Sequence, residues 1–152
     1  MLKQGDKAPD FELIDTNGNK VRLSGFMGKD IVLYFYPKDN TPGCTREACN
    51  LRDNFSSLKN KNIVILGISL DNQESHKKFT KKYSLPFPLL SDTKAEVAEK
   101  YGVYRKKLFF GKSLLGIKRT TFLIDKNGLI KHIFDSVDVN NHTQQILEAL
   151  RK

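Results

Sequence analysis

The stretch YFYPKDNTPGCTREACNLRDNF, residues 34 to 55, joins a predicted strand to a predicted helix. The apolar, β-branched and aromatic run from Ile31 to Tyr36 is typical of a buried strand, and Pro37 ends it. Thr41 then stands at the N-cap position of a helix, and Pro42 occupies the first turn. A backbone N–H has no intrahelical partner there, so its absence in proline costs nothing. A buried strand followed directly by a helix is typical of an α/β protein.

The only two cysteines of the chain, Cys44 and Cys49, both fall in this predicted helix. Cys44 lies in the first turn, where free backbone N–H groups and the helix dipole favour a thiolate over a thiol. On a continuous helix, residues five apart have Cα atoms roughly 8 to 9 Å apart, whereas a disulfide needs less than about 7 Å. Joining the two sulfurs therefore requires the first turns to unwind, which suits a redox cycle better than a structural disulfide.

Strand and helix patterns alternate along the rest of the chain. Strands are predicted at residues 21–23, 31–36, 63–70, 121–124 and 129–134. Helices are predicted from 42 to about 61, from about 71 to 82, from about 94 to 100 and from about 141 to 150. A βαβ opening followed by a hairpin and a terminal helix predicts an α/β sheet covered on both faces.

Several segments resemble one known family. The string Pro37-x-x-x-Thr41-x-x-Cys44 resembles the active-site signature of the peroxiredoxins, and TPGCTREAC resembles their Q-type subfamily, also called bacterioferritin comigratory protein. Further segments occur in the order that the family shows: GDKAPDFEL, LSGFMGKDIVLYFYP, VILGISLD, YGVY and KRTTFLIDKNGLI. The resemblance covers nearly the whole chain. It implies a single domain over residues 1–152, with a thioredoxin fold, the peroxiredoxin-type N-terminal extension and a mixed central sheet.

The resemblance implies a thiol peroxidase that reduces hydrogen peroxide and organic hydroperoxides. Cys44 matches the peroxidatic cysteine, and Cys49 is the candidate resolving cysteine, which would attack the Cys44 sulfenic acid and form an intramolecular disulfide. Thioredoxin or a similar donor would then reduce that disulfide by thiol–disulfide exchange. No haem, flavin or metal cofactor is implied.

The resemblance also implies roles for residues around Cys44. The Thr41 hydroxyl and the Arg119 guanidinium would bind the peroxide, together with the backbone N–H groups of Gly43 and Cys44. Pro37 would shield the thiolate from water.

Glu47 would help to fix the environment of the arginine. From the sequence alone, each of these side chains also has a plainer interpretation: Thr41 as an N-cap, Pro37 as a strand terminator, Glu47 as an exposed helix residue and Arg119 as a charge at the rim of the sheet.

Composition limits the class of protein. With 152 residues, 39% of them hydrophobic, the chain can bury a sizeable core without disulfide or metal staples. Its first residues are polar, and no apolar stretch approaches the roughly 20 residues that span a bilayer. We therefore expect a cytoplasmic protein, working as a monomer and not bound to a membrane. In that reducing compartment, two cysteines are more often catalytic or redox-sensing than structural.

The net charge of +9 raises the question of nucleic-acid binding. The basic residues are scattered in short groups, and no run is long enough to form a basic tail. We interpret them as a solvated surface with weak attraction for polyanions, and we expect no specific nucleic-acid partner.

Two other function classes stay open at this point. A thioredoxin-type thiol–disulfide oxidoreductase would normally carry C-x-x-C, whereas this chain has C-x4-C. A redox-sensing or polyanion-binding module would show no turnover. Zinc binding is disfavoured because the cysteine spacing is unusual and His76, His132 and His142 show no ligand pairing. His142, near the terminal helix, is expected to be a surface or capping residue.

Overall fold

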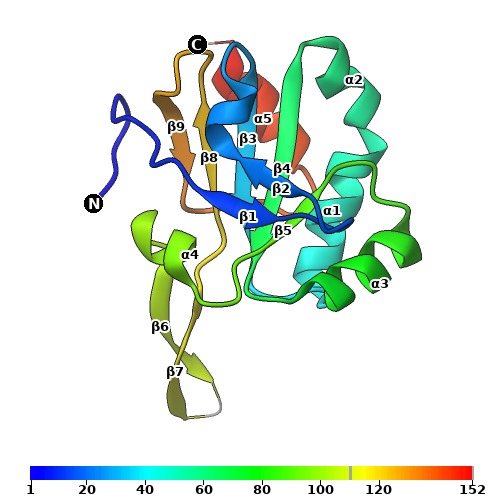
Figure 1. The fold of residues 1–152 in the computed structure, drawn as a ribbon, viewed down its shortest axis with the longest axis vertical. Coiled ribbons are helices and arrows are strands. Elements are labelled where there is room, and N and C mark those ends of the chain that lie inside the picture. Colours follow the sequence, from blue (N-terminus) through cyan, green and yellow to red (C-terminus); the bar gives the residue numbers. More distant parts are fainter. Residues whose placement is uncertain (110, 152) are drawn as a thin grey trace.

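The computed structural model describes residues 1–109 and 111–151, and a mixed sheet of seven strands forms its centre (Figure 1). The strand order in this sheet is β2-β1-β5-β4-β3-β8-β9, and a separate two-stranded sheet contains β6 and β7. The strands are β1 Glu12–Ile14, β2 Lys20–Arg22, β3 Asp30–Phe35, β4 Ile63–Ser69, β5 Leu89–Ser91, β6 Tyr104–Phe109, β7 Lys112–Ile117, β8 Thr120–Ile124 and β9 Ile130–Phe134. The helices are η1 Leu23–Phe26, a 3-10 helix, and α1 Pro42–Asp53, α2 Phe55–Asn60, α3 Gln73–Tyr83, α4 Glu96–Lys100 and α5 His142–Leu150.

Strand β3 pairs with strands of both directions. It runs parallel to β4, with Ile31 opposite Val64, and antiparallel to β8, with Phe35 opposite Thr120. The parallel pair requires a crossover, which α1 and α2 supply. Strands β8 and β9 form an antiparallel hairpin whose turn contains Gly128 at a φ of 80°. The predicted βαβ unit, hairpin and terminal helix are thus confirmed.

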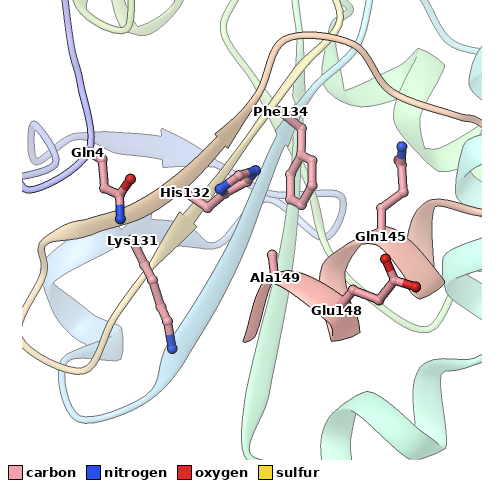
Figure 2. Close-up of a pocket in the computed structure, with 7 residues that line it drawn as sticks. All are labelled: Gln4, Lys131, His132, Phe134, Gln145, Glu148 and Ala149. Carbon is pink, nitrogen blue, oxygen red and sulfur yellow. The ribbon is translucent and has the colours of Figure 1, made fainter. Parts of the chain in front are cut away.

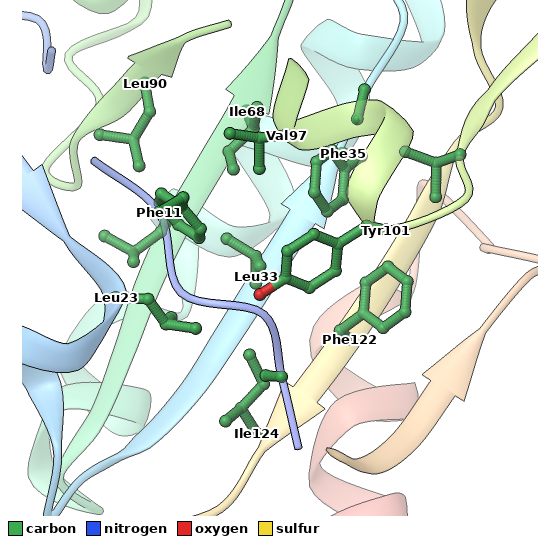
Figure 3. Close-up of a cluster of buried hydrophobic side chains, with 14 of the residues drawn as sticks. Phe11, Leu23, Leu33, Phe35, Ile68, Leu90, Val97, Tyr101, Phe122 and Ile124 are labelled. Carbon is green, nitrogen blue, oxygen red and sulfur yellow. The ribbon is translucent and has the colours of Figure 1, made fainter. Parts of the chain in front are cut away.

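Alternate side chains of β3 enter two separate hydrophobic clusters, one on each face of the sheet. The first cluster combines β3, β4 and β8 with α4 and the N-terminal segment, and includes Phe11, Leu33, Phe35, Ile68, Val97, Tyr101 and Phe122 (Figure 3). The second combines β3 with α1, α2, α3 and α5, and includes Val32, Tyr34, Tyr36, Cys44, Ala48, Leu51, Leu58, Phe79 and Ile146. The sheet is therefore covered by helices on both faces, as predicted.

The helix predicted from residue 42 to 61 is in fact two helices. The backbone of Asn54 leaves helical geometry, with φ −111° and ψ 12°. Its N–H bonds to the carbonyl of Arg52, and its side-chain amide donates to the carbonyl of Asn50 at 2.8 Å. Asparagine offers the backbone such local alternatives to the helical bond, which is why the single-helix prediction was wrong here.

Strands β1 and β5 and the β6–β7 hairpin were not predicted. Strands β1 and β5 each span three residues, too short for a periodic pattern to be recognised. The β6–β7 hairpin projects beyond the end of the main sheet and, among the described strands, forms a separate two-stranded sheet (Figure 1). Its sequence, YRKKLF and KSLLGI, lacks the regular alternation of a half-buried strand.

None of the described helices combines the length and apolar character that crossing a bilayer requires.

Gly67 in β4 provides the space for the Tyr34 ring, and this predicts a sensitive position in the core. A Cβ atom at residue 67 would lie 2.8 Å from Tyr34 Cζ and 2.8 Å from Leu89 Cδ2. Because strand neighbours cannot separate without strain, we expect Gly67→Ala to lower the free energy of unfolding by about 1–3 kcal/mol, measured by urea titration. Gly25→Ala is the matched control, since a Cβ atom there meets nothing within 4 Å. Equal losses in the two variants would contradict this explanation.

Candidate active site

The loop after β3 and the first turn of α1 carry the predicted site. Thr41 occupies the N-cap position with an extended backbone, and Pro42 is the first helical residue, as predicted. The Thr41 hydroxyl makes no capping bond to a helix amide and instead donates to the carbonyl of Lys38 at 2.8 Å. Thr41 is therefore an N-cap by position only. Its hydroxyl hydrogen is already engaged, so the side-chain oxygen can serve a ligand only as an acceptor.

One guanidinium connects two residues of α1. Arg119, just before β8, donates from Nη2 to Cys44 Sγ at 3.3 Å and from Nη1 to Glu47 Oε1 at 2.6 Å. Cys44 and Glu47 are three residues apart, so they lie on the same face of the helix. The planar fork of arginine presents one nitrogen to each group in a fixed geometry, which the single nitrogen of a lysine does not provide.

The burial of Glu47 and Arg119 argues against the surface roles that the sequence alone allowed for them. The Glu47 side chain is 0% exposed and that of Arg119 is 21% exposed. Glu47 is therefore not an exposed helix residue, and Arg119 is more than a charge at the rim. Cys44, at 1% exposure, belongs to the hydrophobic cluster under α1.

Gly43 allows the guanidinium to approach the first turn of α1. A Cβ atom on Gly43 would lie 3.0 Å from Arg119 Nη2, a tight contact that would require the guanidinium to shift. Pro37 is half-buried in the loop between β3 and α1. The structure thus brings Arg119, Gly43, Cys44 and Glu47 together and places Pro37 and Thr41 on the loop that leads to them.

Cys49 lies on the same helix as Cys44. Both thiols are free, with Cys44 buried and Cys49 partly buried. Helix α1 runs without interruption from Pro42 to Asp53, through both positions. The expected Cα separation of a continuous helix therefore applies, and a disulfide cannot form without opening α1.

The buried Glu47 carboxyl has an unusually high pKa. Burial raises the pKa of Glu47 to about 7, while the Arg119 guanidinium opposes that rise. Glu47 Oε2 has no hydrogen-bond partner among the described residues. Near neutral pH, Glu47 is therefore balanced between a carboxylate paired with Arg119 and a neutral acid.

His142 faces this carboxyl from the first turn of α5. Its Nε2 lies 3.8 Å from Glu47 Oε2, and its side chain is 0% exposed. Of the two roles expected for His142, a surface residue or a capping residue, the surface role was therefore wrong. Sequence offered no signal for this role, because the partner, Glu47, lies far away in the chain.

The hydrogen bonds of His142 define its tautomer. Nδ1 lies 2.9 Å from Gln145 Oε1, an oxygen that also accepts from the backbone N–H of Asp138, so Nδ1 carries the hydrogen. Burial lowers the pKa of His142 to about 4, so the ring is neutral at pH 7 and Nε2 accepts from Thr121 Oγ1 at 2.8 Å. His142 thus presents no positive charge to Glu47 at neutral pH.

A second buried network fixes the loop between β3 and α1. Asp39 accepts from the Tyr36 hydroxyl through Oδ1, while its Oδ2 lies 2.7 Å from His76 Nδ1. The backbone N–H of Asp39 donates to Asp71 Oδ2 at 2.8 Å. These contacts tie the loop that carries Pro37 to α3 and to the end of β4.

The same residues form a cluster with metal-binding chemistry. Ligand atoms of Asp39, Asp71 and His76 lie within 4.8 Å of one another, a proximity that the spacing of the histidines in the sequence did not indicate. However, Asp39 Oδ2 also accepts from Ser75 Oγ, and Asp71 Oδ2 accepts from Ser69 Oγ. Protein donors thus meet the oxygens that a cation would need, and the cluster is best explained as a hydrogen-bond network.

A hollow of about 430 Å³ lies elsewhere, between β9 and α5 (Figure 2). Its lining includes His132 and Phe134 from the strand and Gln145 and Glu148 from the helix. None of the predicted site residues lines it, and neither cysteine is among its lining residues. We therefore place the chemistry at Cys44 rather than in this hollow.

Comparison with known proteins identifies the family. The chain matches the AhpC/TSA family over residues 4–133. It is 49% identical over 150 residues to the peroxiredoxin Bcp of Bacillus subtilis, covering 99% of this chain and 96% of that protein. This chain belongs to the Bcp, or Q-type, peroxiredoxins.

Two solved structures have the same fold as this peroxiredoxin. A cysteine-to-serine variant of Xylella fastidiosa PrxQ has a TM-score of 0.93 and 31% identity, covering 99% of this chain and 96% of that one. The bacterioferritin comigratory protein of Xanthomonas campestris has a TM-score of 0.87 and 34% identity, covering 93% of this chain and 90% of that one. The thioredoxin fold predicted from the resemblance is confirmed.

The Glu47 carboxyl predicts a pH-dependent stability. Its pKa is about 7 in the fold and 4.5 ordinarily, so between these values the folded protein holds a proton that the unfolded chain has released. This stabilisation is present at low pH and is lost as the pH rises through 7. Since one pKa unit equals about 1.4 kcal/mol, we expect roughly 3 kcal/mol of loss between pH 5 and pH 8 relative to Glu47→Gln.

Urea titration of both proteins over this pH range measures the difference. A Cys44→Ser background in both proteins removes the thiol from the titration. Parallel pH profiles with and without the Glu47→Gln substitution would contradict a buried, proton-binding carboxyl at this position.

Proposed function

We propose that this peroxiredoxin is a thiol peroxidase that reduces hydrogen peroxide and organic hydroperoxides, with Cys44 as its peroxidatic cysteine. The observation that carries the proposal is the Arg119 guanidinium, which donates to Cys44 Sγ while Glu47 holds its other nitrogen. The related Xanthomonas campestris protein has alkyl peroxide reduction activity, which supports the substrate class.

Thiolate formation alone cannot account for such an enzyme. An ordinary thiol with a pKa of about 8.5 is a few per cent ionised at pH 7, so complete ionisation gains roughly 30-fold, or about 2 kcal/mol. Typical enzymes lower the barrier by at least about 8 kcal/mol. The remainder requires donors aimed at the oxygens of the breaking bond.

The residues around Cys44 offer such donors. The Cys44 thiolate attacks one peroxide oxygen, and the S–O bond forms as the O–O bond breaks. The leaving oxygen takes up a proton and departs as water or an alcohol. Arg119 and the backbone N–H groups of Gly43 and Cys44 stabilise the developing negative charge. Thr41 Oγ1, whose hydrogen is held by Lys38, accepts a hydrogen bond from the peroxide O–H.

We propose that Cys49 resolves the sulfenic acid after α1 has opened. The Cys49 sulfur attacks the Cys44 sulfur, the S–S bond forms and the S–O bond breaks with release of water. A dithiol reductant such as thioredoxin then exchanges with this disulfide and supplies two electrons, which restores both thiols. The peroxide accepts two electrons in each cycle and the dithiol reductant supplies them, so no cofactor is required.

The partner and setting of the enzyme belong to the same proposal. We expect a monomer as the working unit, since both cysteines of the proposed disulfide lie on the same helix. Pro37 would shield the thiolate from water, and the opened helix would present the disulfide to thioredoxin. The two free cysteines are compatible with the reducing cytoplasm, where we place the enzyme.

The two cysteines should have separable roles. Cys44→Ser should abolish peroxide consumption, because a serine hydroxyl is not ionised near neutral pH. Cys49→Ser should react once with peroxide, then accumulate the sulfenic acid and over-oxidise faster than wild type. Peroxide consumption coupled to thioredoxin, with mass spectrometry of the products, measures both effects. Retained turnover in Cys44→Ser would overturn the assignment, and unchanged recycling in Cys49→Ser would remove Cys49 from the mechanism.

Arg119 should act on the transition state as well as on thiolate formation. Loss of a preorganised donor to developing charge typically slows an enzyme about 10²–10³-fold, and we expect a decrease of that order in Arg119→Met. The rate of the peroxide step is compared by stopped flow at a pH where Cys44 is ionised in both proteins. An equal rate there would limit Arg119 to an effect on ionisation. Arg105→Met, in the exposed β6–β7 hairpin, serves as the matched control.

A further inference from the structure

The N-terminal end of α5 is capped by a side chain from α1. The first backbone N–H groups of a helix have no intrahelical partners, and Asn141, at the N-cap position of α5, makes no side-chain capping bond. Instead, Asn50 Oδ1 accepts from Thr143 N at 2.9 Å and from Thr143 Oγ1 at 2.8 Å. Asn50 Nδ2 donates to the carbonyl of Asn140 at 2.9 Å. We call these three bonds the Asn50 clamp.

The clamp lies in the part of α1 that must open. Asn50 directly follows Cys49, and it lies one helical turn beyond Glu47, which faces His142 in the first turn of α5. Unwinding α1 past Cys49 therefore separates Asn50 from α5. Thr143, which is 1% exposed, would then lose the acceptor for its buried N–H and hydroxyl. Leaving buried donors without acceptors is unfavourable, so the clamp opposes opening.

We propose that Asn50 is a positioning residue that holds α1 folded against α5 and thereby sets how readily Cys49 reaches the Cys44 sulfenic acid. The inference rests on the disulfide mechanism proposed above. While α1 stays folded, the sulfenic acid is kept from Cys49. A second hydroperoxide can then oxidise it to sulfinic acid, with one oxygen transferred to sulfur and one alcohol or water released. The Asn50 clamp thus sets the division between disulfide and over-oxidised enzyme.

Asn50→Ala tests the proposal because it removes all three bonds and leaves the contacts of Cys44 with Arg119 in place. We expect the ratio of disulfide to sulfinic acid to rise about tenfold, the change that follows from losing about 1.4 kcal/mol of stabilisation in folded α1. Rapid mixing with excess hydrogen peroxide, followed by mass spectrometry, measures this ratio. The rate of the first peroxide step should match wild type.

Two independent measurements report the equilibrium between folded and opened α1. Amides of residues 42–53 in the reduced variant should exchange about tenfold faster with deuterium, while those of β3 and β4 keep their protection. The reduction potential of the disulfide should fall by about 30 mV, the equivalent of tenfold for a two-electron couple. Equal loss of protection across the strands would mean general destabilisation and would overturn the positioning role.

Matched variants separate the clamp from other effects. Asn50→Asp keeps an acceptor for Thr143, and a carboxylate is favourable at the N-terminus of α5, so it should stay close to wild type. Thr143→Val removes only the hydroxyl bonds and should shift the ratio in the same direction by less. Asn60→Ala, an exposed asparagine in α2 whose side chain makes no hydrogen bond to α5 among the described residues, is the control and should change nothing.

Different outcomes would overturn the proposed disulfide mechanism and the proposed role of the Asn50 clamp. A wild-type enzyme that forms no Cys44–Cys49 disulfide with peroxide would overturn the mechanism and the clamp's role with it. A wild-type enzyme that forms the disulfide, with an unchanged product ratio in Asn50→Ala, would overturn the clamp alone.

Discussion

The Arg119 guanidinium is shared between the Cys44 sulfur and the Glu47 carboxyl, and this sharing joins the central sheet to the helix that carries the thiol. The sheet register makes the contact possible. Antiparallel pairing sets Thr120 opposite Phe35, so the start of β8 lies beside the end of β3, from which the chain turns into α1. Arg119 therefore reaches the first turn of α1 from a neighbouring strand. The position of the thiol thus depends on how two buried strands are paired.

A single cation between two acidic groups also creates a competition. If Cys44 and Glu47 are both ionised, Arg119 must serve two buried anions, and burial penalises the second of them. The raised pKa of Glu47 reflects this environment, since desolvation outweighs the attraction of the guanidinium. His142 adds no charge to help, because it is neutral and its Nε2 accepts from Thr121. Desolvation therefore favours a neutral Glu47 when the Arg119 guanidinium is directed at the Cys44 sulfur.

Much of this arrangement could be predicted from local sequence. The run from Ile31 to Tyr36, the Thr-Pro helix start and the placement of Cys44 in the first turn depend on neighbouring residues, and all three are confirmed. The resemblance to the peroxiredoxins added Arg119 and Glu47, which local pattern alone would have assigned to the surface.

The remaining features depend on distant contacts that no local pattern encodes. His142 is buried because Glu47 and Thr121 surround it, and its own neighbours in sequence are polar. The break at Asn54 depends on a side-chain bond that competes with a helical one. Among the described strands, β6 and β7 pair with each other and not with the main sheet, so most of their sequence does not follow the pattern of a buried sheet face. A sequence pattern predicts an element from the regular spacing of its buried residues. His142, the break at Asn54 and the β6–β7 hairpin do not follow such a spacing, so the sequence did not predict them.

Helix α1 has to satisfy two opposing requirements, and its boundaries show how it does so. A folded helix keeps Cys44 at its N-terminus beside Arg119, whereas an opened one is needed to join Cys44 to Cys49. The separate helix α2, beginning at Phe55, limits what must open. Its Leu58, 0% exposed, belongs to the core cluster and can keep α2 in place while α1 unwinds. The break at Asn54 would thus confine the proposed unfolding to the helix that carries both thiols, and the polar contacts with α5 would oppose it.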